Sequence, residues 1–260
     1  MVLTKENVRN IVSETILNML FEDKRLVDNF ALVEKLMEFG TNDDFYFVQI
    51  IKRYKDNKDD NAKRQGQIDG TYHGGAWYLK SWRVHSVAEL EKLKPEIIKT
   101  AEDNNARAYI TVNSRSEIET NNYIKIYSQK FRAGDARIAH ADDIVAGQAK
   151  SGDSWKNVRL RLFLDVDCPK DATIHGYNIW DEVREMLQRY SIKTLGEYET
   201  PSGGLHIILA NKNNKNLIPF KKELVKFDNW INKGLLATVH PNEDGKIILY
   251  SNVETKGYEE

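Results

Sequence analysis

Val158–Asp167 (VRLRLFLDVD) alternates apolar and polar residues more regularly than any other stretch of this chain. Successive side chains of a β-strand point to opposite faces, so one face of this segment carries only valine and leucine. The other face carries Arg159, Arg161, Phe163, Asp165 and Asp167. The pattern predicts a strand that packs one face on a core and presents charged groups on the other.

Asp165 and Asp167 lie on one face of the predicted strand, about 6 to 7 Å apart along it. Carboxylates at this spacing repel each other and can share hard divalent cations, and they need a counter-charge to stay ionised. A solvated strand end with arginine partners is the commoner explanation of a lone Asp-x-Asp. Here the apolar run before the pair favours the end of a central strand, where open sheets place their sites.

The segments after this strand predict a β-α-β-β unit. A helix is expected around 179–190, where Ile179, Val183, Met186, Leu187 and Tyr190 share one face, and strands are expected at 192–199 and 205–210. A last strand is predicted at Lys246–Tyr250. Helices on one side and an open sheet face on the other bury these apolar faces most simply.

Thr200–His206 (TPSGGLH) joins two of these strands through a proline, a serine and two glycines. The alternation that follows turns Leu205, Ile207 and Leu209 toward the core and His206 to the opposite face. Glycine beside a polar strand residue often marks the close approach of a ligand or of another backbone. A glycine-rich hairpin with an incidental histidine is the alternative, but the aspartates one connection earlier favour a joint site.

LFLDVD (162–167) and SGGLH (202–206) together resemble the first two motifs of the archaeo-eukaryotic primase and primase-polymerase superfamily. The resemblance implies an α+β fold: an RRM-like β-α-β-β catalytic core with an open mixed or antiparallel sheet, plus an N-terminal helical and α/β flank. It implies that Asp165 and Asp167 hold Mg²⁺ or Mn²⁺, and that Ser202, Gly203, Gly204 and His206 form the nucleotide-binding motif. Asp165, Asp167 and His206 would be the catalytic residues.

The family's third motif adds a carboxylate on a later strand, and here the sequence departs from the pattern. Asp228 lies in a stretch with helical spacing, whereas Glu243 and Asp244 lie in a turn before the last strand. None of them ends an apolar strand. The segment HPNEDGKIILY (240–250) also looks like the end of compact primase-like proteins of phages and mobile elements.

The first half of the chain predicts a helical pair and then mixed α/β structure. Helices are expected at 8–20, 26–37, 118–131 and 135–149, and in a segment capped by Ser86 and interrupted at Pro95. Strands are expected at 45–53, 76–84 and 107–115. Loops are expected at 56–75, as a lid or a disordered insert, and at 150–157. We expect a helical segment at 1–42, a flank at 43–150 that completes the cleft and a primase-like core at 151–260. One continuous domain over 43–260 is the alternative.

Four arginines are candidates to bind the triphosphate or the template backbone. Arg107 and Arg115 share the polar face of their predicted strand, and Arg159 and Arg161 lie on the strand of the aspartates. Tyr109 and Phe163 are candidates for base stacking. Each of these residues also has an ordinary role open to it, as a surface or salt-bridge arginine or as a covered aromatic ring.

Charge and motif content narrow the classes of function. The chain has 38 Lys and Arg against 39 Asp and Glu, so any site for a polyanion has to be a local patch. The single cysteine, Cys168, excludes an internal disulfide, and no secretory or membrane-spanning segment is evident, so we expect a cytoplasmic protein. The phosphate loop, the dinucleotide fingerprint, the HExxH zinc motif and the serine elbow are absent. The histidines other than His206 are scattered and are expected to be structural or superficial.

Three functions remain open at this stage. The first is a metal-dependent nucleotidyltransferase that takes nucleoside triphosphates and single-stranded nucleic acid, with a helicase or another replication protein as a candidate partner. The second is a non-catalytic protein that binds nucleotide or nucleic acid on the same fold. The third is a phosphodiesterase or nuclease with the same metal ligands, which shortens its substrate instead of extending it.

Overall fold

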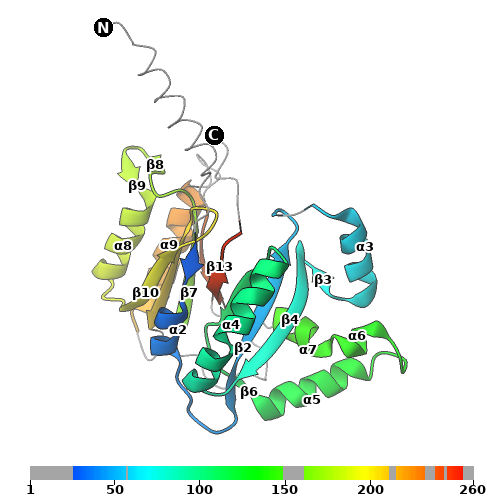
Figure 1. Cartoon of the computed structure of the whole chain (residues 1–260). Helices are drawn as coiled ribbons and strands as arrows, with labels where there is room; N and C mark the ends of the chain where they lie inside the picture. The colour runs from blue at the N-terminus through cyan, green and yellow to red at the C-terminus, as the bar shows by residue number, and fades with distance from the viewer. Residues whose placement is uncertain are drawn as a thin grey trace, which may run out of the picture.

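The computed structural model describes residues 26–56, 58–148, 161–210, 215–231, 238–242 and 245–253 (Figure 1). Within these ranges the chain is an α+β protein with two main antiparallel sheets. The predicted helix at 8–20, the loop at 150–157, Arg159, Glu243 and Asp244 lie outside the described residues. No described helix combines the length and the apolar character that crossing a membrane requires.

The smaller sheet contains the carboxylate strand. Its strands are β7 (Arg161–Asp167), β10 (Thr194–Glu199), β11 (Leu205–Ala210) and β12 (Thr238–Asn242), in the order β10-β11-β7-β12, and every neighbouring pair is antiparallel. Helix α8 (Ile179–Arg189) follows β7 after a hairpin of β8 (Thr173–Ile174) and β9 (Tyr177–Asn178), and α9 (Leu217–Ile231) precedes β12. The predicted β-α-β-β order is confirmed, and a second helix and strand extend it.

One face of the smaller sheet packs as the alternation predicts, but the prediction that the other face is open is wrong, because the larger sheet covers part of it. Leu162, Leu164 and Val166 pack with Leu205 and Ile207 against α8 and α9, in one core cluster. Phe163 and Ile208 point to the other face and belong to the core cluster of the larger sheet. The side of β7 that carries the aspartates therefore faces the rest of the molecule and not bulk solvent alone.

The larger sheet combines strands from both ends of the chain. Its order is β1 (Val27–Asp28), β13 (Lys246–Ser251), β5 (Arg107–Thr111), β2 (Asp44–Arg53), β4 (Ala76–Val84) and β3 (Tyr72–His73), and β6 (Arg115–Ser116) also pairs with β2. The predicted last strand is confirmed as β13, but it pairs with β5 and β1 and not with the strands of the smaller sheet.

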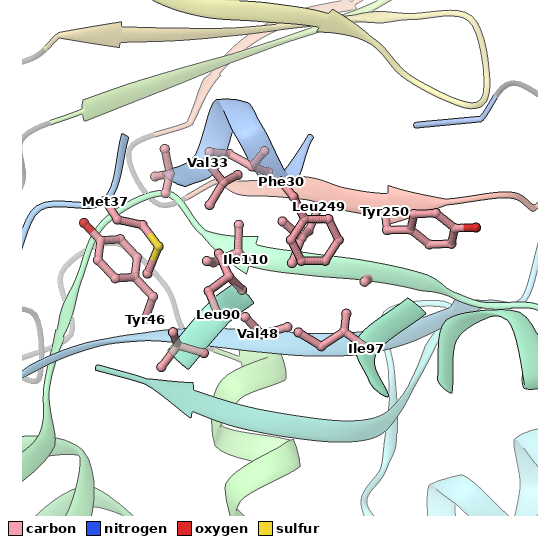
Figure 2. Packing of buried hydrophobic residues seen from close by; sticks show 14 of the residues in the cluster. Phe30, Val33, Met37, Tyr46, Val48, Leu90, Ile97, Ile110, Leu249 and Tyr250 are labelled. Atoms are coloured by element: carbon pink, nitrogen blue, oxygen red, sulfur yellow. The ribbon is translucent and has the colours of Figure 1, made fainter. Parts of the chain in front are cut away.

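Helices cover both faces of the larger sheet. Figure 2 shows one core, in which Phe30 and Val33 of α2 (Phe30–Leu36) and Leu90 and Ile97 of α4 (Val87–Asp103) pack on β2, β5 and β13. On the other face, α7 (Ala141–Gln148) packs on the phenylalanines of β2. Helices α5 (Glu117–Ser128) and α6 (Ala136–Ala139) precede α7 and complete this side (Figure 1).

The predicted loop at 56–75 is wrong, because this segment contains helix α3 (Asp60–Asp69) and strand β3. The side chain of Asp59 caps the start of α3 by accepting the Ala62 N–H, and Gly70 ends it with a left-handed φ of 75°. Gly66 packs against Tyr72 and Trp77, where a side chain would collide. The sequence did not predict this helix because it is exposed and is held by its caps and one glycine contact, so it has almost no apolar periodicity.

Three predicted boundaries also need correction. Helix α4 is capped by Ser86 as expected but runs through Pro95 without interruption, because Leu90 and Ile97 on either side of it are buried in the same core. The segment 107–115 forms two strands, since the chain leaves β5 at Val112 and rejoins β2 as β6. The expected helix at 26–37 shortens to α2, because Val27 and Asp28 pair with β13.

Candidate functional site

A cavity of ≈ 390 Å³ lies between the two sheets, at the end of β7 that carries the aspartates. Phe163, Asp165, Asp167 and His206 line it from the smaller sheet. The larger sheet contributes the opposite wall, with Arg53, Lys55, Tyr78, Arg107, Tyr109, Lys246 and Ile248. At the other end of β7, the buried amide of Asn113 joins the two sheets, because it donates to the Arg161 carbonyl at 3.1 Å and accepts the Arg161 N–H at 3.2 Å.

The sequence correctly predicts that Asp165, Asp167 and His206 come together. Asp165 lies directly opposite His206 in the pairing of β7 with β11, and His206 Nε2 is 3.1 Å from Asp165 Oδ1. The Asp165 side chain is 36% exposed, and Asp167 is exposed at the end of the strand. Both carboxylates are therefore open to the cavity, whereas the imidazole is held beneath its surface.

The imidazole of His206 is packed on two sides, and each of its nitrogens has a polar neighbour. Its ring makes edge-on contacts with Phe163, at a centroid distance of 4.5 Å, and with Tyr198, at 5.0 Å. Its Nδ1 lies 2.7 Å from the Tyr198 hydroxyl oxygen. Phe163 is only 3% exposed, so its ring supports the histidine and leaves little surface for base stacking.

Cationic side chains of the larger sheet face the carboxylates. Arg53 ends β2, Lys55 follows in the turn, and Arg107 starts β5. Arg107 forms a buried ion pair with Asp56 at 2.8 Å, and its Nε has no hydrogen-bond partner within the described ranges. Among the same residues no carboxylate forms an ion pair with Arg53 or Lys55. This wall can accept an anion.

Electrostatic coupling connects this wall with the carboxylates. Desolvation, and after it the positive charge of Arg107, lowers the pKa of Lys55, while Asp56 and Asp167 act in the opposite direction. An anion near Lys55 would offset this crowding of positive charge, and so would stabilise the ammonium form.

Lys246 is the cation held most firmly at this site. Its Nζ donates to Gln49 Oε1 at 2.8 Å, to the Ala146 carbonyl at 2.6 Å and to the Gly147 carbonyl at 3.3 Å. Burial, followed by the positive charges of Arg115 and Arg53, lowers its pKa to about 7. Lys246 thus ties β13 to the carboxyl end of α7 and makes the charge of the cavity wall dependent on pH.

The glycine-rich turn forms the rim of the cavity through Thr200 and Ser202. The Thr200 N–H donates to the Gly204 carbonyl at 2.7 Å, and the Thr200 hydroxyl accepts the Gly204 N–H at 3.0 Å. Gly203 has a φ of 86°, a conformation that favours glycine. Gly203 and Gly204 shape the turn but do not line the cavity themselves.

Two of the predicted arginines point elsewhere. Arg161 is buried and donates to the Leu36 carbonyl at the end of α2 and to the Tyr46 hydroxyl at 3.3 Å. Arg115 is 1% exposed on β6 and does not line the cavity. Arg161 faces the interior because the larger sheet covers that side of β7, and Arg115 is buried on β6, which pairs with β2 of the larger sheet. The alternation of residues does not reveal these tertiary contacts.

The structure gives Asp228 a backbone partner. Asp228 lies on α9, as its helical spacing predicts, and its Oδ1 accepts the Val239 N–H at 2.7 Å. On β12 the positions opposite Asp167 and Asp165 are Thr238 and His240. The parts of the chain that the structure describes contain no group of three or more His, Cys, Asp or Glu side chains arranged to hold a metal ion.

The sequence interpretation did not identify Arg53, Lys55, Lys246, Thr200 or Tyr198 as site residues, although all but Tyr198 line the cavity and Tyr198 contacts His206. Three basic residues among positions 52–55, at the end of a predicted strand, are a signal for the first two. For Lys246 and Tyr198 the site depends on how β13 and β10 meet in space, which no local pattern encodes.

Comparisons with known protein families, with curated proteins and with solved structures find no match for this chain. Carboxylate oxygens are the donors that Mg²⁺ and Mn²⁺ prefer, and Asp165 and Asp167 supply them at the cavity surface. The donor set thus fits a hard divalent cation in composition.

Proposed function

We propose that this chain is a metal-dependent nucleotidyltransferase of primase-polymerase type, which uses nucleoside triphosphates on a single-stranded nucleic-acid template. The observation that carries the proposal is that two carboxylates and two cations lie on opposite walls of one cavity. The carboxylates are Asp165 and Asp167, and the cations are Arg53 and Lys55. A nucleoside triphosphate with its divalent cations is a ligand that needs both kinds of wall.

The residues of the chain have separable roles in this proposal. Asp165 and Asp167 would hold Mg²⁺ or Mn²⁺, which, when bound, neutralises phosphate charge and activates the attacking hydroxyl. Arg53, Lys55 and Arg107 bind the triphosphate. In the reaction a 3′-oxygen forms a bond to the α-phosphorus, the bond to pyrophosphate breaks, and the hydroxyl proton passes to solvent.

His206 and the turn act on the nucleotide in the same proposal. The imidazole is anchored beneath the surface beside Asp165, so a proton on Nε2 can be donated to a phosphate oxygen. Ser202 at the rim offers a hydroxyl to the same group. Tyr109 is the aromatic side chain of the cavity with room to contact a base, because Phe163 is covered.

We also propose that the smaller sheet and its two helices form an RRM-like core. The support is the chain order strand, helix, strand, strand, helix, strand, combined with the spatial order β10-β11-β7-β12 and antiparallel neighbours throughout. This is the split β-α-β arrangement, in which the first and third strands are central. Asp165 and His206 lie on these two central strands.

The test is template-directed synthesis with Mg²⁺ or Mn²⁺, a single-stranded template, and labelled ribonucleoside and deoxyribonucleoside triphosphates. Wild type should make product, and Asp165→Asn or Asp167→Asn should reduce it at least about 100-fold, because each removes charge that holds the metal. Asp171→Asn is the matched control, because Asp171 is exposed and does not line the cavity. Equal product from all four proteins would contradict the proposal, and shortening of the template would indicate a nuclease.

Metal-independent nucleotide binding is a second candidate. Arg53 and Lys55 favour it, because they form no ion pair with a carboxylate in the described part of the chain and can bind phosphate without a metal ion. Titration of a nucleoside triphosphate in the presence of EDTA distinguishes the two. Affinity that is unchanged by EDTA and by loss of both aspartates, with no product, would support a binding protein.

A further inference from the structure

Tyr198 connects the two sheets at the back of the candidate site. It belongs to β10 of the smaller sheet and is half-buried against the core cluster of the larger one. Its hydroxyl oxygen accepts the Ile248 N–H of β13 at 2.6 Å and lies 2.7 Å from His206 Nδ1. One hydroxyl therefore touches both walls of the cavity.

The two contacts of the Tyr198 hydroxyl limit where its proton can go. The Ile248 N–H occupies one lone pair of the Tyr198 oxygen, and the hydroxyl proton then needs an acceptor. Within the described ranges His206 Nδ1, 2.7 Å away, is the hydrogen-bond partner that can accept it. Burial raises the pKa of Tyr198 well above its usual value, so the hydroxyl stays protonated and remains a donor.

The other ring nitrogen completes the arrangement. If Nδ1 accepts from Tyr198, a neutral imidazole carries its proton on Nε2. Nε2 lies 3.1 Å from Asp165 Oδ1, so the nearby carboxylate also favours a proton on Nε2. Donation therefore runs from Ile248 N–H to Tyr198 and from Tyr198 to His206, and it leaves the imidazole proton on Nε2, beside Asp165.

We propose that Tyr198 is a positioning residue: its hydroxyl fixes the Nε2–H tautomer of His206 and directs that N–H into the cavity. This inference rests on the proposed function for its consequence, the donation to a nucleotide phosphate, but the tautomer itself is a property of the free protein. Because the same oxygen holds β13, the placement of the larger sheet also sets the direction of the imidazole.

The first experiment needs no nucleotide. Asp165 also favours the Nε2–H tautomer, so the comparison is made without it, between Asp165→Ala and Asp165→Ala/Tyr198→Phe of the metal-free full chain. ¹⁵N spectra of labelled histidine report which nitrogen carries the proton, and the signal of His206 among the six histidines is the one lost in His206→Asn. The Nε2–H form should dominate in the single variant and give way to a tautomer mixture in the double variant. The same tautomer composition in both proteins would overturn the inference.

The second experiment separates positioning from support of the fold. Tyr198→Phe should weaken binding of a magnesium nucleoside triphosphate about 3- to 10-fold, which corresponds to one hydrogen bond, but should have no effect in the His206→Ala background. Tyr190→Phe is the matched control, because it removes a tyrosine hydroxyl that contacts Glu223 outside the cavity. An equal loss in both backgrounds would mean that Tyr198 acts only through β13 and would overturn the inference. If no nucleotide binds at all, the proposed function fails and the ¹⁵N comparison still decides the role of Tyr198.

Discussion

Among the cationic residues of the cavity, Arg53 provides the simplest test of anion binding. It ends β2 at the cavity wall, and among the described residues it has no carboxylate partner. Arg107, by contrast, shares its charge with Asp56 at 2.8 Å. Arg53 can therefore bind a phosphate in the cavity without loss of an internal ion pair.

Arg53→Gln should weaken binding of a nucleoside triphosphate in EDTA by about 10- to 150-fold, since hydrogen bonds to charged groups contribute about 1.5 to 3 kcal/mol. Arg64→Gln, on the exposed surface of α3, is the matched control and should bind like wild type. Equilibrium titration gives both affinities. The same loss in both variants would point to general charge and not to this site.

Lys246 makes the free energy of unfolding depend on pH, because its surroundings lower its pKa in the folded protein. Burial and the charges of Arg115 and Arg53 lower its pKa from 10.5 to about 7 in the folded protein. The unfolded chain keeps the ordinary value, so it binds a proton that the folded protein releases between these two pKa values. The free energy of unfolding should therefore rise with pH between about 7 and 10.5. Below about pH 7 the folded protein should bear the full cost of burying the Lys246 charge.

The measurement is denaturant unfolding of wild type and Lys246→Met at about pH 7 and about pH 9, a range below the titration of ordinary tyrosines. Wild type should gain more stability than the variant between the two conditions, because only wild type carries the titrating ammonium. Parallel gains in both proteins would show that Lys246 keeps its ordinary pKa in the fold.

Helix α7 and strand β4 meet at a position where only glycine fits. A Cβ on Gly147 would lie 2.4 Å from the Tyr78 ring, which lines the cavity. Gly147→Ala should therefore destabilise the protein by about 1 to 3 kcal/mol through overpacking. In a Tyr78→Ala background the same change should be neutral or stabilising, because alanine favours a helix by about 0.5 to 1 kcal/mol over glycine. Thermal unfolding of the four proteins measures this cycle, and an equal effect in both backgrounds would contradict the contact.

Elements with strong apolar periodicity were predictable, and elements held by caps and tertiary contacts were not. The alternation of Leu162, Leu164 and Val166 predicts β7 and its buried face, and both are confirmed. Helix α3 escapes prediction because of its 10 residues only Gly66 is buried. The sequence also did not predict the break between β5 and β6. This break depends on pairing with β13 and β2, which lie far away along the chain.

At the scale of the whole molecule, the candidate site belongs to neither sheet alone. The sequence predicts the carboxylates and His206, which lie near one another in the chain and share one sheet. The cationic wall comes from β2, β5 and β13 and depends on the last strand returning to the first half of the chain. Composition gave no sign of this wall, because the formal charge of −1 averages over a local concentration of cations.

The position of metal and phosphate in the cavity tests the account most directly. Crystals of the full chain grown with Mn²⁺ and a non-hydrolysable nucleoside triphosphate analogue would locate the metal by its anomalous scattering. The account predicts Mn²⁺ on Asp165 and Asp167, with the triphosphate reaching Arg53 and Lys55 across the cavity. Manganese bound away from both aspartates, or phosphates bound outside this cavity, would contradict it.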